Sequence, residues 1–462
     1  MLKIDWSKYE RPGDLPNFES LARRYRFQTL GRACRDRGID SLFLAHHEDD
    51  QVETVMMRMI NGHRRFGLVG MKRDSEIPEC HGIHGVHESG GLNNTLNQTI
   101  TNSSASLTQD LQSKVGYLKP LPTEIGGIRV YRPLLGFKKA RLMATCKAAN
   151  IEWFEDNSNK DPTVTTRNAI RHMYNSHSVP TALTAPSLLN LSEKMERNYN
   201  NLLKVANSCL EGTTKNLETR TGTMSIRFPY LGHLNSSVSR RDKGLVAALI
   251  LRQVITFVTP EEQVHLHALH GAVDRIFQEI FKDVSLPKPT AFTVSGVQFR
   301  PLRASTVHIE AQSLEGKYEW LISRQPYSSI LSNRPNIRAP PPSNSFLQPP
   351  WSPWTLYDGR FWFRIQNRSA RSIVIRPFMK DDMATFMLSL DKSHQTLLRD
   401  VLKNLAPGDV RWTLPAIVTE ELDGRERVLA LPTLDVCALN MQKHVSWEVR
   451  YKKVDTGRLQ YR

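Results

Sequence analysis

Two histidines and four acidic residues lie within eight positions of the chain, from His46 to Glu53. Asp50 and Glu53 are three residues apart, so on a helix their side chains share one face. Mg²⁺ prefers oxygen ligands, and two carboxylates on one face could both reach one ion. The alternative is purely structural: Asp50 caps a helix and Glu53 reaches back to it, as in a capping box.

The elements around this segment are those of a strand followed by a helix. Residues 41–45 form a short apolar run, which predicts a buried parallel strand. From Val52 to Ile60, apolar residues recur at the spacing of an amphipathic helix. Ligands of open α/β sheets collect at the carboxyl ends of strands, where helix N-termini favour anions. We therefore expect His46, Asp50 and Glu53 to meet a nucleotide or its metal ion.

The segment His46-His47-Glu48-Asp49-Asp50-Gln51-Val52-Glu53-Thr54 resembles the HHxDDQxET signature of the tRNA(Ile)-lysidine synthetases, which are PP-loop (N-type ATP pyrophosphatase) proteins. Further motifs of that family follow in the required order and cover most of residues 15–175. They are an ExxARxxR-like helix at 19–27, a glycine turn at 67–71, an RPLL-like strand at 131–135, and a DxSN...RNxxR-like segment formed by 156–159, Arg167, Asn168 and Arg171.

The resemblance implies an ATP-dependent ligase that modifies tRNA. ATP adenylates the C2 oxygen of the wobble cytidine in an isoleucine tRNA with a CAU anticodon; free lysine then attacks C2, and AMP leaves. Asp50 and Glu53 would hold Mg²⁺ or the lysine ammonium, and His46 would contact the nucleotide. Four arginines and one asparagine would face phosphates: Arg23, Arg26, Arg167, Asn168 and Arg171. Without the resemblance, a solvated helix face is the alternative for Arg167 and Arg171.

One family motif is absent from the sequence. Lysidine synthetases begin with a strand and an SGGxDS loop, whose backbone amides bind phosphate. Residues 1–6 resemble the second half of an internal strand, and Ser89-Gly90-Gly91 lacks the Asp-Ser pair and follows the signature. We expect the phosphate loop to be missing, which leaves ATP turnover by this chain alone open. A non-catalytic tRNA-binding remnant and a related PP-loop tRNA-modifying enzyme stay open as alternatives.

Composition predicts several parts. Residues 89–113 are rich in polar residues, which predicts a disordered insertion, and prolines cluster near 340–350. The expected fold class is α/β. Its parts are an incomplete Rossmann-like (adenine nucleotide alpha hydrolase-like) parallel-sheet domain at 1–180 with an insertion at 72–127, a helical tRNA-binding accessory domain at 181–334, a Pro-rich linker at 335–355, and a β-rich module at 356–462.

The formal net charge of +16 favours a polyanionic partner, and tRNA is the candidate that the resemblance supplies. A basic, solvated surface is the alternative. No apolar run is long enough to span a bilayer, and the five cysteines lack paired spacing. We expect a mitochondrial location, because the polar insertion and Pro-rich segment are typical of eukaryotes while the modification serves bacterial-type translation. The cytoplasm is the alternative.

Overall fold

The computed structural model describes most of the chain and divides it into two compact units, each treated separately below. Residues 1–79 and 128–205 form unit 1, and residues 80–127 and 206–462 form unit 2. The described residues are 2–9, 11, 13, 15–90, 118–154, 165–234, 239–280, 289–302, 315–330, 333–342, 349–421 and 424–455.

The sheet of unit 1 has three strands in the order β1 (Ser41–Phe43), β3 (Arg129–Tyr131) and β2 (Asp74–Glu76). β1 runs parallel to β3, with Leu42 opposite Val130, and β2 is antiparallel to β3. The parallel strand expected at 41–45 is therefore confirmed. Its expected burial is wrong, since Phe43 is 67% exposed. Among the described residues β1 has a neighbouring strand on one side only, which leaves its outer edge open.

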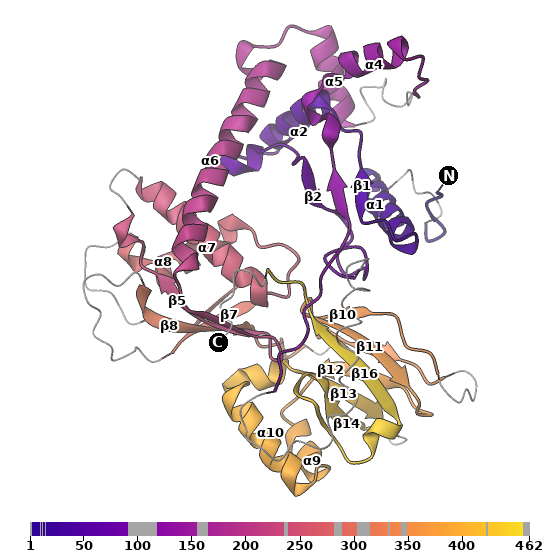
Figure 1. The fold of residues 1–462 in the computed structure, drawn as a ribbon, viewed down its shortest axis with the longest axis vertical. Coiled ribbons are helices and arrows are strands. Elements are labelled where there is room, and N and C mark those ends of the chain that lie inside the picture. The colour runs from indigo at the N-terminus through magenta and orange to yellow at the C-terminus, as the bar shows by residue number, and fades with distance from the viewer. Residues whose placement is uncertain are drawn as a thin grey trace. The chain divides into compact units, whose positions relative to one another are not determined.

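Helices surround this small sheet, and the helix expected from Val52 onward is confirmed as α2. Val52, Val55 and Met56 of α2 are buried against Ile170 and Leu188 from two later helices, so the apolar stripe forms the core of the unit. Figure 1 shows α2 and α5 together at one end of the sheet. The helices are α1 (Phe18–Asp36), α2 (Glu48–Ile60), α4 (Lys139–Ala148), α5 (Thr166–Ser176) and α6 (Ala185–Glu211), of which residues 206–211 belong to unit 2, with 3₁₀ turns η2 (Arg65–Leu68), η3 (Pro133–Gly136) and η5 (Thr181–Leu183).

In its described residues, unit 2 is built on antiparallel sheets accompanied by helices (Figure 1). The first sheet contains β4 (Lys215–Glu218), β5 (Thr223–Pro229), β8 (Glu315–Arg324), β7 (Val297–Pro301) and β6 (Phe292–Val294). The second contains β10 (Thr355–Tyr357), β11 (Phe361–Asn367) and β16 (Val445–Tyr451). The third contains β15 (Val436–Cys437), β14 (Glu426–Leu431), β13 (Pro415–Glu420), β12 (Ile373–Pro377) and β9 (Ile337–Ala339).

The helices of unit 2 are α7 (Arg240–Val258), α8 (His270–Ile276), α9 (Asp382–Leu388) and α10 (Lys392–Asn404). Six 3₁₀ turns accompany them: η6 (Leu231–His233), η7 (Leu266–Leu269), η8 (Gln278–Ile280), η10 (Gly408–Thr413), η11 (Pro432–Leu434) and η12 (Met441–Lys443). No helix in the described part of the chain is both long and apolar enough to cross a bilayer.

The observed boundaries differ from those expected. Part of the predicted insertion at 72–127 belongs to the folded structure. Residues 74–76 form β2, and Ile77, Cys80 and Val86 are fully buried. Burial of these apolar side chains stabilises this part despite the polar composition of the insertion. The polar tract at 91–117 lies outside the described residues. The predicted helical domain at 181–334 also contains the first sheet of unit 2. The predicted linker at 335–355 includes β9, which pairs with β12, so it is not a linker throughout.

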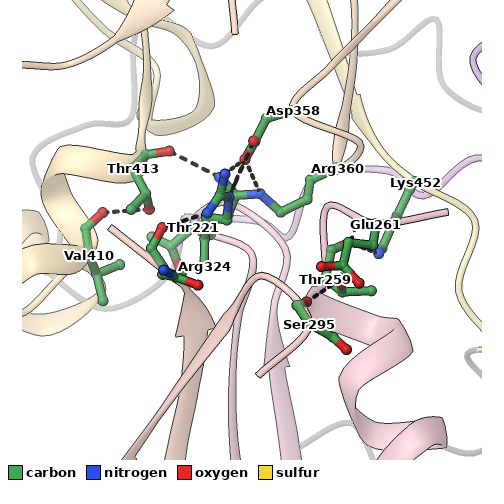
Figure 2. Close-up of polar contacts among 11 residues, drawn as sticks. Thr221, Thr259, Glu261, Ser295, Arg324, Asp358, Arg360, Val410, Thr413 and Lys452 are labelled. Atoms are coloured by element: carbon green, nitrogen blue, oxygen red, sulfur yellow. Dashed lines mark hydrogen bonds and ion pairs between the residues drawn. The ribbon is translucent and has the colours of Figure 1, made fainter. Parts of the chain in front are cut away.

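A buried ion cluster connects the parts of unit 2. The guanidinium of Arg360 is fully buried and donates to Asp358 Oδ2 at 2.9 Å, to the Thr413 carbonyl at 3.1 Å and to the Thr221 carbonyl at 3.4 Å. Arg324 also approaches the Asp358 carboxylate, at 3.2 Å (Figure 2). These contacts join the β4–β5 turn, the β10–β11 turn and η10.

Lys452 lies near the same cluster, where its ammonium donates to the Thr259 carbonyl at 2.6 Å (Figure 2). Burial, with the charge of Arg360, lowers the pKa of Lys452 to about 7. The centre of unit 2 therefore contains costly buried charge that persists only because each group has a partner.

Replacing Arg360 with Met should destabilise unit 2 by about 3 kcal/mol, because the buried Asp358 carboxylate loses its closest cation and two carbonyls lose their donor. Urea unfolding followed by circular dichroism measures this change. Arg371→Met is the matched control, since the Arg371–Glu421 ion pair is partly exposed and should contribute less than about 1 kcal/mol. Equal effects of the two substitutions would contradict the central role of Arg360.

Candidate functional site

The segment from His46 to Glu53 forms the junction between β1 and α2. The Leu44 amide donates to the Tyr131 carbonyl at 2.8 Å, which continues the pairing of β1 with β3 beyond the strand. The His47 amide then donates to Asp50 Oδ2 at 3.0 Å, so Asp50 reaches back to the helix start. The capping alternative is thus partly correct. Because α2 begins at Glu48, Asp50 takes the reaching-back position that the sequence assigned to Glu53.

The Glu53 side chain is instead engaged by two arginines of α5. Arg171 donates Nε to Glu53 Oε1 at 2.5 Å and Nη2 to Oε2 at 3.1 Å, and Arg167 Nε lies 3.3 Å from Oε2. Arg171 also approaches Asp50 Oδ1 at 3.5 Å. Glu53 is only 4% exposed, and burial raises its pKa while the Arg171 guanidinium opposes that shift. The bidentate contact with Glu53 fixes the direction of the Arg171 guanidinium, and the contact with Oε2 fixes that of Arg167.

The start of α5 explains how these arginines reach α2. The Thr165 hydroxyl accepts the Asn168 amide at 3.1 Å and caps the helix. Asn168 is buried in this first turn, and Ile170 packs on the apolar face of α2. Arg167 and Arg171, one helical turn apart, therefore project toward Glu53. The solvated-face alternative is wrong for these two side chains.

Positive charge gathers around His46. Burial lowers the pKa of His46, and Arg132, Arg167 and Arg23 lower it further, although Asp50 raises it. Burial also lowers the pKa of Arg26, and the positive charges of Arg23 and Arg167 lower it further. The charges of arginines from α1, α5 and the end of β3 thus act on His46, while Arg23 also forms an ion pair with Glu79 at 3.4 Å. His46 Nδ1 is buried without a hydrogen bond to any described residue.

Sequence reasoning did not single out Arg132 as a site residue. Its guanidinium donates to the Lys72 carbonyl and to Ser75 Oγ, each at 3.0 Å, which fixes it beside the carboxyl end of β3. The signal that could have found it is its position directly after a parallel strand, where ligands collect.

The Gln51 side chain, which sequence reasoning also did not single out as a site residue, holds the glycine turn that follows η2. The Gln51 side chain accepts the Met71 amide at 2.6 Å and donates to the Met71 carbonyl at 2.9 Å. The Gly70 amide donates to Ser192 Oγ at 2.9 Å, and a Cβ at Gly70 would lie 2.5 Å from Gln51 Oε1. The turn therefore requires glycine at position 70 and is tied to both α2 and α6.

The two carboxylates predicted to bind Mg²⁺, Asp50 and Glu53, are both in contact with an arginine. Both Glu53 oxygens are bonded to Arg171, which leaves Asp50 Oδ1 as the less engaged carboxylate oxygen. Within the described residues, no three or more His, Cys, Asp or Glu side chains gather as a metal site. The roles assigned to the predicted residues stay predictions, although the structure brings His46, Asp50, Glu53 and the expected arginines together.

Comparison with known proteins gives one domain match and a set of relatives. A family model described as a PP-loop domain matches residues 1–85 and 107–177, which confirms the expected Rossmann-like fold class. A probable tRNA(Ile)-lysidine synthase of Schizosaccharomyces pombe is 24% identical over 435 residues, covering 94% of this chain and 76% of that protein. The matched domain includes every predicted site residue.

Bacterial relatives match shorter stretches. The tRNA(Ile)-lysidine synthase of Methylobacterium nodulans is 26% identical over 204 residues, which is 44% of this chain and 45% of that protein. That of Chlamydia muridarum is 37% identical over 70 residues, which is 15% of this chain and 22% of that protein. The chain therefore spans less than half the length of these two bacterial relatives.

Replacing Arg171 with Met should destabilise unit 1 in a pH-dependent way. Without its guanidinium partner, the pKa of Glu53 should rise further above its usual 4.5. The loss should be about 3 kcal/mol at pH 8, where the buried carboxylate is ionised, and should shrink as the pH falls toward 4.5, where it is protonated. Urea unfolding at several pH values measures it, with exposed Arg32→Met as the control. A pH-independent loss would argue against the pairing.

Binding of an anion at the arginine cluster should raise the pKa of His46, because it would neutralise the charges that lower this pKa. Titration of selectively labelled histidines by NMR, with and without tripolyphosphate, measures the shift, and His46→Gln identifies the signal. A downward shift, or none at saturating tripolyphosphate, would count against an anion site.

Proposed function

Because the chain belongs to the tRNA(Ile)-lysidine synthase family of PP-loop proteins, we propose that it ligates lysine to C2 of the wobble cytidine of an isoleucine tRNA with a CAU anticodon, using ATP. The observation that carries the proposal is the pairing of Arg167 and Arg171 of α5 with Glu53 in the signature segment, beside His46, on which arginines from α1 and the end of β3 also act. A concentration of guanidinium groups suits a reaction between two polyphosphate-bearing substrates.

The reaction consists of two displacements. In the first, the C2 oxygen of cytidine bonds to the α-phosphorus of ATP, and pyrophosphate leaves. In the second, the lysine amine bonds to C2, the C2–O bond breaks, AMP leaves and the amine loses a proton. Both steps develop negative charge on phosphate oxygens, which prearranged cations stabilise most effectively.

The chain's own residues have separate roles in this proposal. Glu53 orients Arg171 by accepting its N–H groups and holds Arg167 by an ion pair, and these arginines with Arg23 and Arg26 neutralise phosphates. His46 is kept in its neutral form by burial and by the surrounding arginines, so it is suited to hydrogen-bond the nucleotide without adding charge. Asn168 contributes through the helix start that carries Arg167.

Asp50 is the carboxylate left to bind a cation. Its Oδ1 lies 3.5 Å from Arg171 Nη2, while both oxygens of Glu53 are taken by guanidinium N–H groups. We therefore assign the lysine ammonium, or a Mg²⁺ ion shared with ATP phosphates, to Asp50 and not to the Asp50–Glu53 pair. When bound, Mg²⁺ would neutralise phosphate charge, and one or two carboxylates with phosphate oxygens are its common ligand set.

The tRNA partner is supported by the net charge of +16, and the mitochondrial location by the long polar tract and the proline cluster. The cytoplasm stays the alternative location.

Incubation with labelled lysine, ATP labelled in its α-phosphate and the CAU isoleucine tRNA should give lysine-bearing tRNA and an equal amount of AMP. Asp50→Asn should lower the rate by about a hundredfold or more, because a charge that positions the substrate is lost. The control is Glu48→Gln, at the position next to the second histidine that the signature leaves variable. It should retain activity within about threefold.

Two outcomes would contradict the proposal. Lysine incorporation that Asp50→Asn leaves unchanged would refute the assigned site. Binding of the tRNA without lysine incorporation or AMP release would favour a non-catalytic tRNA-binding protein instead.

A further inference from the structure

Unit 2 contains a cavity that takes no part in the site described above. It has a volume of about 600 Å³ and is lined by residues of α9, α10 and η10. Its apolar side is formed by Met383 and Met387, one turn apart on α9, and by Leu402 of α10. This volume falls within the range of small-ligand pockets, roughly 300–1,000 Å³, and the cavity is widely open to solvent.

Three cationic side chains line the same cavity. Arg399 and Lys403 are one turn apart on α10 and exposed, and Arg411 comes from η10. Within the described part of the chain, no acidic side chain forms an ion pair with any of the three. The Arg411 Nε atom is buried and has no hydrogen-bond partner there.

The walls of the cavity are fixed by the surrounding structure. The buried Asp382 at the start of α9 accepts two N–H groups of Arg376, at 2.7 and 2.9 Å, and the Met379 amide at 2.8 Å. Leu398 and Val401 anchor α10 in the core. The cavity is therefore preformed and not dependent on a mobile loop.

A fourth guanidinium lies beside the cavity at Gly408, which has a φ of +62°. This φ favours glycine, and a Cβ at this position would lie 3.0 Å from Arg300 Nη1, so a larger residue would displace the end of the arginine side chain. The cavity is thus lined by flexible methionine side chains and by several positively charged side chains.

We propose that this cavity binds a nucleoside phosphate, with the base against Met383 and Met387 and the phosphate held by Arg399, Lys403 and Arg411. Methionine sulfur makes favourable contacts with aromatic rings, and guanidinium groups match phosphate oxygens in geometry and charge. An acidic amphipathic helix would need a groove several turns long. The seven-residue α9 offers less than that. The nucleotide is either free or the terminal residue of an RNA strand.

Photo-crosslinking of the full chain with 8-azido-AMP, followed by peptide mapping, tests the proposal. Crosslinks should appear between residues 383 and 411, separate from any at the start of α2. The double substitution Arg399→Ala with Lys403→Ala should raise the half-saturating concentration about tenfold or more, since each lost charge-assisted contact weakens binding. The control is Lys380→Ala with Lys392→Ala, which removes two exposed cations of the same region outside the cavity.

Competitors identify the part of the ligand that is recognised. AMP should compete for the crosslink, whereas adenosine and inorganic phosphate should each compete at least about tenfold more weakly. A short RNA that competes better than AMP would identify a strand end as the source, and AMP competing better would identify a free nucleotide. Absence of crosslinks between 383 and 411, or crosslinks that the double substitution leaves unchanged, would overturn the proposal.

Discussion

The buried ion pair between Glu53 and Arg171 is the interaction on which the geometry of unit 1 depends. It joins α2 to α5 across 118 residues of sequence, and it fixes the direction of Arg167 as well, because both guanidinium groups contact the same carboxylate. Burial of such a pair offers little net stability. The pair instead serves to position side chains. It keeps mutually repelling arginines close together beside the start of α2, so that they would already be arranged when a phosphate binds.

The same physical principle appears independently in unit 2. Arg360 is fully buried and is tolerated because Asp358 and two backbone carbonyls satisfy its N–H groups. There the paired charges hold sheets and turns together. In unit 1 the charge of Arg167, which is paired with Glu53, also acts on His46 and lowers its pKa.

Several local features could be predicted from the sequence because each depends on nearby residues. The strand at 41–43 and the helix α2 follow from short apolar patterns, and the signature between them located the site. The pairing of Glu53 with Arg171 could not be predicted, since spacing along α2 favoured a shared metal ion and gave no sign of a partner so distant in the chain. The three residues of β2 were missed because their stabilising contacts come from β3 and the buried Ile77.

The central claim is that Glu53 acts on the nucleotide through the arginines that it orients. A double-mutant cycle on the free energy of ATP binding, with Glu53→Gln, Arg171→Met and both together, tests it most directly. Each single substitution should weaken binding, and the double variant should bind no more weakly than the worse single variant. Additive losses would show that the two residues act independently and would contradict the account.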